Sequence, residues 1–370
     1  MHIETFDRLR DADRIRTIWN SLSDNMEISY FLSWAWMENW LATLPASLPV
    51  SLHAVFEGEQ PSAAFFLGTA RIVRRKFFWS RARFLNASGD KTCDDLCIEY
   101  NAFLCRPGSV LPISEVLRLL PGKWDEVIFP ALDAALTPGN LIADVRHPFR
   151  VVVERDAPSR YVDLDKVRGS AQGYLSLLSK KARYHVRRSL EFYQTRGEIV
   201  CEVATTYDRA CAVFEELMTL HQNSWAERGE PGAFASGYFI SFHRELIRKR
   251  FEHGEIQLAR VSCGAETIGC IYAFVRGGNV YFYQSGLSYP REKQVRPGFV
   301  SLVKLIQHNA DCGNRTFDFL GGNAIYKKSL ATDERRLIWV RIQKPRLRFA
   351  IENTLARFKK KLADDEADDG

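Results

Sequence analysis

The chain has 370 residues, of which 46% are hydrophobic and 26% charged, and its formal net charge is +6. This length exceeds one typical hydrophobic core, so we expect two domains. The composition is that of a soluble globular protein, and no apolar run approaches the roughly 18 residues that a membrane span needs. The first residues also lack the apolar block of a signal peptide, so we expect a cytoplasmic location.

The eight cysteines are scattered along the chain. Cys93 and Cys97 form the only close pair, and neither a second pair nor a histidine cluster accompanies them. This spacing does not match a zinc site, so we expect no bound metal.

Hydrophobic periodicity predicts an alternation of helices and strands in the first half. Helices are expected over residues 11–22 and within 29–44, where Trp36 and Trp40 share one face. The following elements are strands at 50–56, 62–72, 77–86, 94–100, 124–132, 150–156 and 160–165, with a helix around 113–120. Ala157, Pro158 and Ser159 are expected to separate the last two strands.

The second half is expected to begin with a long helix from Gly169 to Arg196 and a strand at 198–204. Helices over 207–225 and 237–251 precede three strands within 255–287, which short glycine turns connect. A helix from 298 to about 311 then leads to a strand at 315 and a last strand at 336–343. Because a strand–helix–strand crossover is normally parallel, the pattern predicts an α/β (α+β) fold with a mixed, mostly antiparallel sheet flanked by helices.

Residues 344–370 divide into a basic amphipathic helix and an acidic tail that we expect to be disordered. A basic amphipathic helix can lie on an anionic membrane surface, or it can pack on its own domain with a solvated face.

Several stretches indicate a site for an anionic ligand. A helix begins near Gly298, with Pro297 at its start and Arg291, Lys293 and Arg296 before it. Such a start suits a phosphate or pyrophosphate, although an ordinary capped helix after a loop would look the same.

Within residues 180–188, Lys180, Arg183 and Arg187 fall on one helical face, and no acidic residue accompanies them. This face is either solvated or binds a phosphate-bearing substrate, an anionic polymer or RNA.

His221, Trp225 and Arg228 recur at helical spacing and would form a wall that stacks a sugar ring. The alternative is a core tryptophan beside a surface arginine. No G-x-S-x-G elbow, Walker loop, H-E-x-x-H motif or dinucleotide fingerprint is found, which argues against a serine hydrolase, a nucleoside-triphosphatase and a zincin. A transferase that holds two substrates together would fit this pattern.

The stretch "RTFDFLGGNAIYKKSLA", residues 315–331, reads as a buried strand in which Asp318 interrupts an apolar run. The strand ends at Gly321 and Gly322 and is followed by Tyr326 and Lys327.

Together, "LSKKARYHVRRSLEFYQTRG", "LHQNSWAERGEPGAF", "YFYQSGLS", "RPGFVSLVKLIQHNADCGNRTFDFLGG" and "YKKSLA" resemble the GNAT acyltransferase superfamily in its CelD-like branch, related to the Fem-type aminoacyltransferases. The resemblance covers roughly residues 160–332 and extends weakly into the first half. It implies two tandem GNAT-like modules: a degenerate, non-catalytic one over 1–158 and an acyltransferase domain over 159–343. Residues 344–370 would follow as the tail.

The resemblance also implies acyl transfer from acetyl-CoA or another acyl-CoA to a sugar, polysaccharide or cell-envelope precursor. The donor would enter between two parallel strands that splay, "YFYQSGL" and "TFDFLGG". It would contact Gln284, Ser285, Arg296, Gly298, Phe299 and Gly321. The "VRPGFV" loop keeps Gly298 but lacks the superfamily's leading Gln or Arg.

For catalysis, we expect Tyr326 to protonate the leaving group and Asp318 to orient or deprotonate the acceptor, with His221 as a reserve base. Substrate contacts are expected from Arg183, Arg187, Trp225, Arg228, Tyr283 and Lys327. Two alternatives stay open: a transferase that uses aminoacyl-tRNA, and a non-catalytic module of a polysaccharide-assembly complex.

Overall fold

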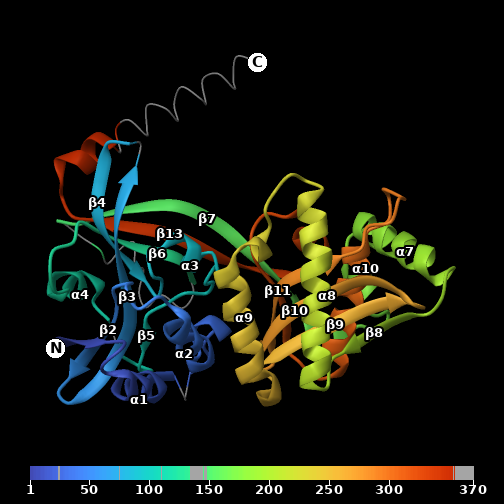
Figure 1. Cartoon of the computed structure of the whole chain (residues 1–370), viewed down its shortest axis with the longest axis horizontal. Coiled ribbons are helices and arrows are strands. Elements are labelled where there is room, and N and C mark those ends of the chain that lie inside the picture. The colour runs from blue at the N-terminus through green and yellow to red at the C-terminus, as the bar shows by residue number, and fades with distance from the viewer. Residues whose placement is uncertain are drawn as a thin grey trace. The chain divides into compact units, whose positions relative to one another are not determined.

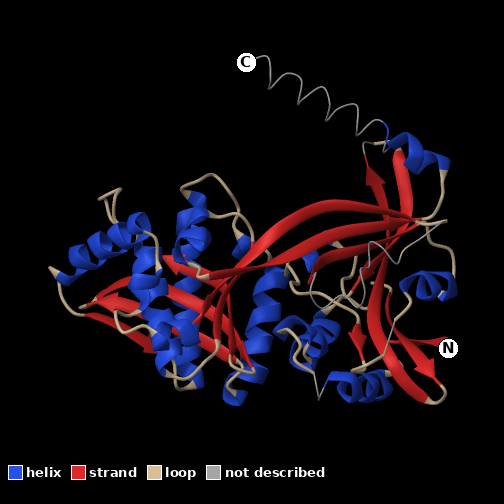
Figure 2. Cartoon of the chain, turned by 180° about the vertical axis from the view of Figure 1, so that it is seen from behind, coloured by secondary structure: helices blue, strands red, loops and turns tan. Residues whose placement is uncertain are grey.

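The computed structural model in Figures 1 and 2 describes residues 1–23, 26–74, 76–109, 111–133, 145, 148–352 and 354. The chain forms two compact units. The first contains residues 1–26, 44–156 and the chain from Ile338 onward, and the second contains residues 27–43 and 157–337. Strands β7 (Arg150–Asp163) and β13 (Asp333–Gln343) each begin in one unit and end in the other. The boundary expected between residues 158 and 159 therefore falls inside a strand.

The first unit contains a mixed sheet in the order β1-β2-β3-β4-β6-β13-β7, with β5 paired to β3. Its strands are β1 (His2–Asp7), β2 (Val50–Glu57), β3 (Gln60–Arg74), β4 (Phe78–Leu85), β5 (Leu104–Cys105) and β6 (Glu126–Asp133). Its helices are α1 (Ala12–Ser23), α3 (Lys91–Asp94) and α4 (Ile113–Leu119). One of its cores gathers residues from β3, α4, β6 and the end of β13.

The second unit contains a sheet in the order β7-β12-β11-β10-β9-β8. The additional strands are β8 (Ile199–Val203), β9 (Ile256–Cys263), β10 (Glu266–Arg276), β11 (Asn279–Leu287) and β12 (Thr316–Gly321). Neighbouring strands are antiparallel except for β11 and β12, which run parallel. The two glycine turns and the crossover predicted from the sequence are therefore confirmed, as is a mixed α/β fold.

Helices cover both faces of this second sheet (Figures 1 and 2). They are α2 (Trp34–Thr43), α6 (Leu164–Gly169), α7 (Lys180–Gln194), α8 (Tyr207–Ala226), α9 (Gly237–Arg250), α10 (Pro297–Asp311) and α11 (Ile325–Leu330). Side chains from α6, α7 and α10 share a core with Ile271 and Ala273 of β10. On the opposite face, Tyr272 and Phe274 contact aromatic rings from α8, α9 and α2. Alternate side chains of β10 thus pack against helices on opposite faces of the sheet.

Glycine allows one of these helices to approach the sheet closely. A Cβ atom on Gly286 of β11 would collide with the Leu217 carbonyl oxygen of α8. Only a residue without a side chain lets the α8 backbone pack directly on β11. This contact places the last turns of α8 beside the end of β11.

The structure differs from the expected elements in three places. Residues 150–163 form one strand, because Pro158 lies where the β7–β12 register shifts and its carbonyl accepts a hydrogen bond from the Gly322 N–H at 3.1 Å. The expected helix over 169–196 is broken at Gly173, whose φ is +74°, and restarts at α7, where Ser179 is the N-cap. Residues 95–100 contain no strand, and the preceding residues form the short helix α3.

The expected tail lies mostly outside the described residues. Residues 347–352 are helical, and 353 and 355–370 are not described. Among the described residues, no helix is long and apolar enough to cross a membrane.

Candidate active site

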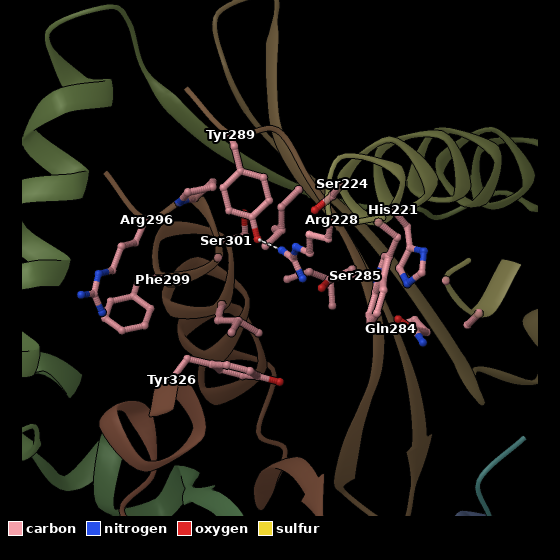
Figure 3. A pocket seen from close by; sticks show the side chains of 18 of the residues that line it. His221, Ser224, Arg228, Gln284, Ser285, Tyr289, Arg296, Phe299, Ser301 and Tyr326 are labelled. Carbon is pink, nitrogen blue, oxygen red and sulfur yellow. Dashed lines mark hydrogen bonds between the residues drawn. The ribbon is translucent and has the colours of Figure 1, made fainter. Parts of the chain in front are cut away.

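A cleft of about 830 Å³ follows the edge of β11 in the second unit (Figure 3). Its walls come from α8 on one face of the sheet and from α10 and α11 on the other. The polar and aromatic lining comprises His221, Ser224, Trp225, Arg228, Glu230, Gln284, Ser285, Tyr289, Lys293, Arg296, Phe299, Ser301 and Tyr326. Such a cleft, mostly apolar with a few convergent polar groups, is the usual form of a small-molecule site.

The cleft exists because β11 and β12 separate. The two parallel strands pair only through Asn279–Thr316, Val280–Phe317 and Tyr281–Asp318. Beyond Tyr281, β11 continues to Leu287, and no described residue of β12 pairs with that part of it. Alternate backbone N–H groups of residues 282–287 therefore face the gap rather than a partner strand.

A local bulge turns β12 away from β11. Leu320 has φ +62°, a left-handed conformation that is uncommon for leucine, and its N–H donates to the Asp318 carboxylate at 2.7 Å. The Lys327 Nζ donates to the Leu320 and Gly321 carbonyl oxygens at 3.1 and 2.7 Å. Asp318 and Lys327 thus stabilise the end of the strand, and neither lines the cleft.

The N-terminus of α10 opens into the cleft without a side-chain cap. Arg296 is the N-cap, its side chain makes no capping hydrogen bond, and Pro297 occupies the first turn. The Arg296 backbone N–H donates to Ser189 Oγ of α7 at 3.1 Å, and its guanidinium lies 5.1 Å from the Phe299 ring centre. Lys293 adds a second positive charge to the lining. This arrangement has the polarity that an anionic ligand requires.

Ser301 lies one turn further along α10 and also lines the cleft. Its side chain is fully buried, and its Oγ has no hydrogen-bond partner among the described residues. A buried hydroxyl without a partner is costly, so it indicates a polar group that binds there.

His221 forms the other wall, in a layer of aromatic rings. It is 4% exposed, stacks on Trp225 with ring centres 5.6 Å apart, and meets the Phe234 ring edge-on. Burial is the main effect that lowers the pKa of His221 below 6.5. The imidazole is therefore neutral at pH 7 and able to accept a proton.

A hydrogen-bond chain assigns the tautomer of His221. The Gln222 Nε2 donates to the Pro231 carbonyl at 2.9 Å, which turns the Gln222 Oε1 toward His221 Nδ1 at 3.2 Å. Because Oε1 can only accept, Nδ1 carries the hydrogen and Nε2 carries the lone pair. A Cβ atom on Gly232, at φ +69°, would lie 2.5 Å from that Oε1, so the loop needs glycine here.

Trp225, Arg228 and Tyr289 continue this wall. The Arg228 guanidinium lies 5.6 Å from the Trp225 ring centre and donates to the Tyr289 hydroxyl at 3.4 Å, as Figure 3 shows. Tyr326 comes from α11, its ring packs edge-on against Phe282 and Phe319, and its hydroxyl points into the cleft in Figure 3.

The structure brings together most of the residues selected from the sequence. The cleft lining includes His221, Trp225, Arg228, Gln284, Ser285, Arg296, Gly298, Phe299 and Tyr326. It does not include Arg183, Arg187, Tyr283, Asp318, Gly321 or Lys327. Arg187 is exposed on α7, Arg183 donates to the Ser176 carbonyl, and the Tyr283 hydroxyl is 3.2 Å from Nε2 of the buried His243.

Ser301, Gln222 and Tyr289 were not selected from the sequence. Ser301 interrupts the apolar run "FVSLVKLI" one turn after Gly298, and this spacing could have placed both on one face of the helix. Gln222 and Tyr289 carry no comparable signal, because their role depends on loops that meet α8 only in the folded chain. Among the described residues, no group of His, Cys, Asp or Glu side chains could hold a metal ion.

Two parallel strands that separate beside an uncapped helix start are the arrangement that the resemblance to GNAT enzymes implies. In agreement, residues 180–328 match the family model described as acetyltransferase (GNAT) domain. Over these residues the match confirms the resemblance to GNAT acyltransferases that the sequence pattern indicated.

Solved structures share the fold over most of the chain. FemX is 10% identical, with a TM-score of 0.55 and coverage of 87% of this chain and 94% of that one. A structure described as the C-terminal domain of a lysylphosphatidylglycerol synthetase from Agrobacterium fabrum is 14% identical, with a TM-score of 0.52 and 96% coverage of both chains. L-PGS from Bacillus licheniformis is 12% identical, with a TM-score of 0.50 and coverage of 89% and 91%. No curated protein matches significantly in sequence. At these identities the likeness concerns the fold alone.

Proposed function

We propose that this chain transfers an acyl group from a coenzyme A thioester to an amine or hydroxyl group of a sugar, polysaccharide or cell-envelope precursor. The observation that carries the proposal is the gap between β11 and β12, which opens beside the uncapped start of α10. An acyl-coenzyme A needs an extended slot with hydrogen-bond donors. Its diphosphate needs positive charge at one end of that slot. The described residues offer both.

The donor would be held by α10 and β11. The backbone N–H group of Gly298, with the side chains of Arg296 and Lys293, suits the diphosphate. Ser301 Oγ would gain the hydrogen-bond partner that it lacks among the described residues. Peptide groups of residues 282–287 along the open edge would bind the pantetheine amides by strand-like hydrogen bonds.

The acceptor would lie against α8. The Trp225 ring offers an apolar face for stacking, and Arg228, Glu230 and Tyr289 offer polar groups for hydroxyls. A flat aromatic surface with polar groups beside it suits a sugar ring. A sugar or a sugar-bearing precursor is therefore the acceptor class that this wall favours.

Transfer requires one bond to form and one to break. The acceptor nitrogen or oxygen attacks the thioester carbonyl, the new C–N or C–O bond forms, and the C–S bond breaks. His221 Nε2, which carries the lone pair, takes the proton that the acceptor loses. The Tyr326 hydroxyl gives a proton to the departing thiolate, and N–H groups on the open edge of β11 stabilise the oxyanion.

This scheme changes the roles expected from the sequence for three residues. His221, expected as a reserve, becomes the base because it lines the cleft in the proton-accepting tautomer. Asp318 and Lys327 become positioning residues, because their charged groups bond to the backbone at the end of β12.

A second candidate donor is aminoacyl-tRNA, which the resemblance to Fem-type transferases implies. One observation favours it: α7 exposes Lys180, Lys181, Arg187 and Arg188. Burial lowers the pKa of His185 on this helix, and Arg296, at the mouth of the cleft, lowers it further. A basic face that leads to the donor site suits the phosphates of an RNA acceptor stem.

A thermal-shift titration distinguishes the donors, because a ligand that binds only the folded chain raises its apparent stability. The proposal predicts that coenzyme A and acetyl-CoA raise the melting temperature of the full chain and that Arg296→Glu removes the shift. The matched control is Arg16→Glu, which reverses an exposed charge on α1 and should keep the shift. Stabilisation by tRNA but not by coenzyme A would overturn the thioester donor in favour of the second candidate.

A further inference from the structure

The β3–β4 hairpin of the first unit exposes an unusual combination of apolar and basic side chains. Arg71 pairs across the strands with Arg81, and Val73 with Trp79, so all four lie on one exposed face. Phe77, beside the turn, is 82% exposed, and Val73 is 58% exposed. Large apolar side chains that cluster in water usually mark an interaction surface.

Residues 347–352 extend the same surface from the other end of the sequence. Phe349 is buried and Glu352 accepts from Arg74 of β3 at 2.7 Å, which fixes this helical turn to the hairpin. The Arg348 guanidinium lies 4.4 Å from the Trp79 ring centre. Leu347 is 85% exposed and Ile351 is 54% exposed. Segments about 270 residues apart in sequence thus place their exposed apolar side chains on one unit.

The charges of this surface are mostly positive and incompletely balanced. Arg71, Lys76 and Arg81 take part in none of the ion pairs found among the described residues. Arg71 and Arg81 face each other across the strands, an arrangement that destabilises a hairpin unless an anion lies nearby. Arg346 and Arg348 share one carboxylate, that of Asp125. The hairpin and the helical turn therefore present an excess of cations around an apolar tip.

We propose that this surface, formed by Arg71, Val73, Lys76, Phe77, Trp79, Arg81, Leu347 and Ile351, docks the chain on a bilayer with anionic headgroups. Phe77 and Leu347 would enter the acyl boundary, and Trp79 would lie at headgroup depth, where tryptophan is enriched. The arginines would contact lipid phosphates. Separate apolar tips surrounded by cations match the apolar interior and the phosphate headgroups of an anionic bilayer.

The inference stands apart from the proposed acyl transfer, because it concerns the first unit and its test measures binding without catalysis.

The test is co-sedimentation of the full chain with vesicles of phosphatidylcholine, with and without phosphatidylglycerol. We expect binding only to the anionic vesicles, and loss of binding in high salt. Phe77→Ser should weaken binding about tenfold, from the lost apolar insertion. Arg71→Glu should weaken it at least about fivefold, because each basic residue near the surface contributes about that factor.

Two variants in the same unit provide matched controls. Leu9→Ser removes an exposed leucine, and Arg16→Glu reverses an exposed arginine, both outside this surface. Both should bind as the parent chain does. Equal binding to neutral vesicles, no binding to either vesicle, or equal losses in Arg71→Glu and Arg16→Glu would overturn the proposal. Dimerisation of the full chain that Phe77→Ser abolishes, without vesicle binding, would assign the surface to self-association instead.

Discussion

Each unit contains two parallel strands that pair over only three residues, but the gap beyond the paired residues is open in one unit and filled in the other. In the second unit, the parallel strands β11 and β12 pair over three residues and then separate. In the first unit, the parallel strands β4 and β6 also pair over three residues, Ala82–Glu126, Arg83–Val127 and Phe84–Ile128. Each pair is followed by a residue of left-handed conformation, Leu320 in β12 and Ala131 in β6.

The units differ in what occupies the space beyond the paired residues. In the first unit, Asn101 occupies it: its Nδ2 donates to the Leu85 carbonyl of β4 at 2.9 Å and to the Pro130 carbonyl of β6 at 3.1 Å. Asn86 donates in turn to Asn101 Oδ1 at 2.8 Å. These buried amides bridge the strands where the second unit has its cleft.

One architecture thus yields a closed core in the first unit and an open slot in the second. Buried amides that satisfy both strand edges stabilise the first unit and leave no edge for a ligand. The second unit leaves its edge and Ser301 Oγ without such partners among the described residues, as a binding site does. We therefore expect chemistry only in the second unit.

The largest effect is expected from His221→Asn. Loss of the base that accepts the proton should lower kcat about 100- to 1,000-fold with little change in donor KM. The matched control is His53→Asn in the first unit, where a buried histidine bonds to Thr5 and Ser51. Steady-state kinetics should show normal kcat for that control. Equal kcat losses in both variants would remove the distinction between the units.

Asn101→Ala should destabilise the first unit by about 2–3 kcal/mol, because it leaves buried carbonyl groups of β4 and β6 without donors. Urea unfolding measures this change. Turnover below the unfolding range should stay at the parent level. A fall in kcat without a fall in stability would show that the closed gap has a catalytic role after all.

Acidification should weaken both units through buried neutral histidines. Burial lowers the pKa of His53 and of His243 to about 3, against 6.5 in the unfolded chain. Between those values the unfolded state binds more protons, so stability falls as the pH falls, by about 1.4 kcal/mol per pH unit for each histidine. Urea midpoints between about pH 7 and pH 5 test this. His53→Gln should make the stability fall less steeply with falling pH. An unchanged slope of stability against pH would contradict this prediction.

The smallest effect is expected from Ser301→Ala. The hydroxyl has no partner to lose within the described protein, so stability should change little. One lost hydrogen bond to the donor should raise its KM about fivefold, which corresponds to about 1 kcal/mol. Isothermal titration with coenzyme A checks the affinity. An unchanged affinity together with lower stability would make Ser301 a structural residue.

The sequence predicted the elements around the cleft because short-range signals determine them. Glycine turns defined β9, β10 and β11, and Pro297 defined the start of α10. It did not predict that Pro158 lies inside β7, since the carbonyl contact to Gly322 forms only in the folded sheet.

The same limit applies to the roles of charged residues. Asp318 and Lys327 are of residue types that are common in catalytic sites, but both side chains bond to the backbone at the Leu320 bulge. The closure of the first unit by Asn86 and Asn101 depends on a contact between loops and strands that no local pattern reveals.

Hydrogen–deuterium exchange of the full chain, with and without acetyl-CoA, tests the central difference between the units most directly. Binding in the open slot predicts slower exchange across residues 282–302 and unchanged exchange across residues 82–105. Protection of residues 82–105, or no protection of residues 282–302 at saturating acetyl-CoA, would contradict the assignment of the donor site.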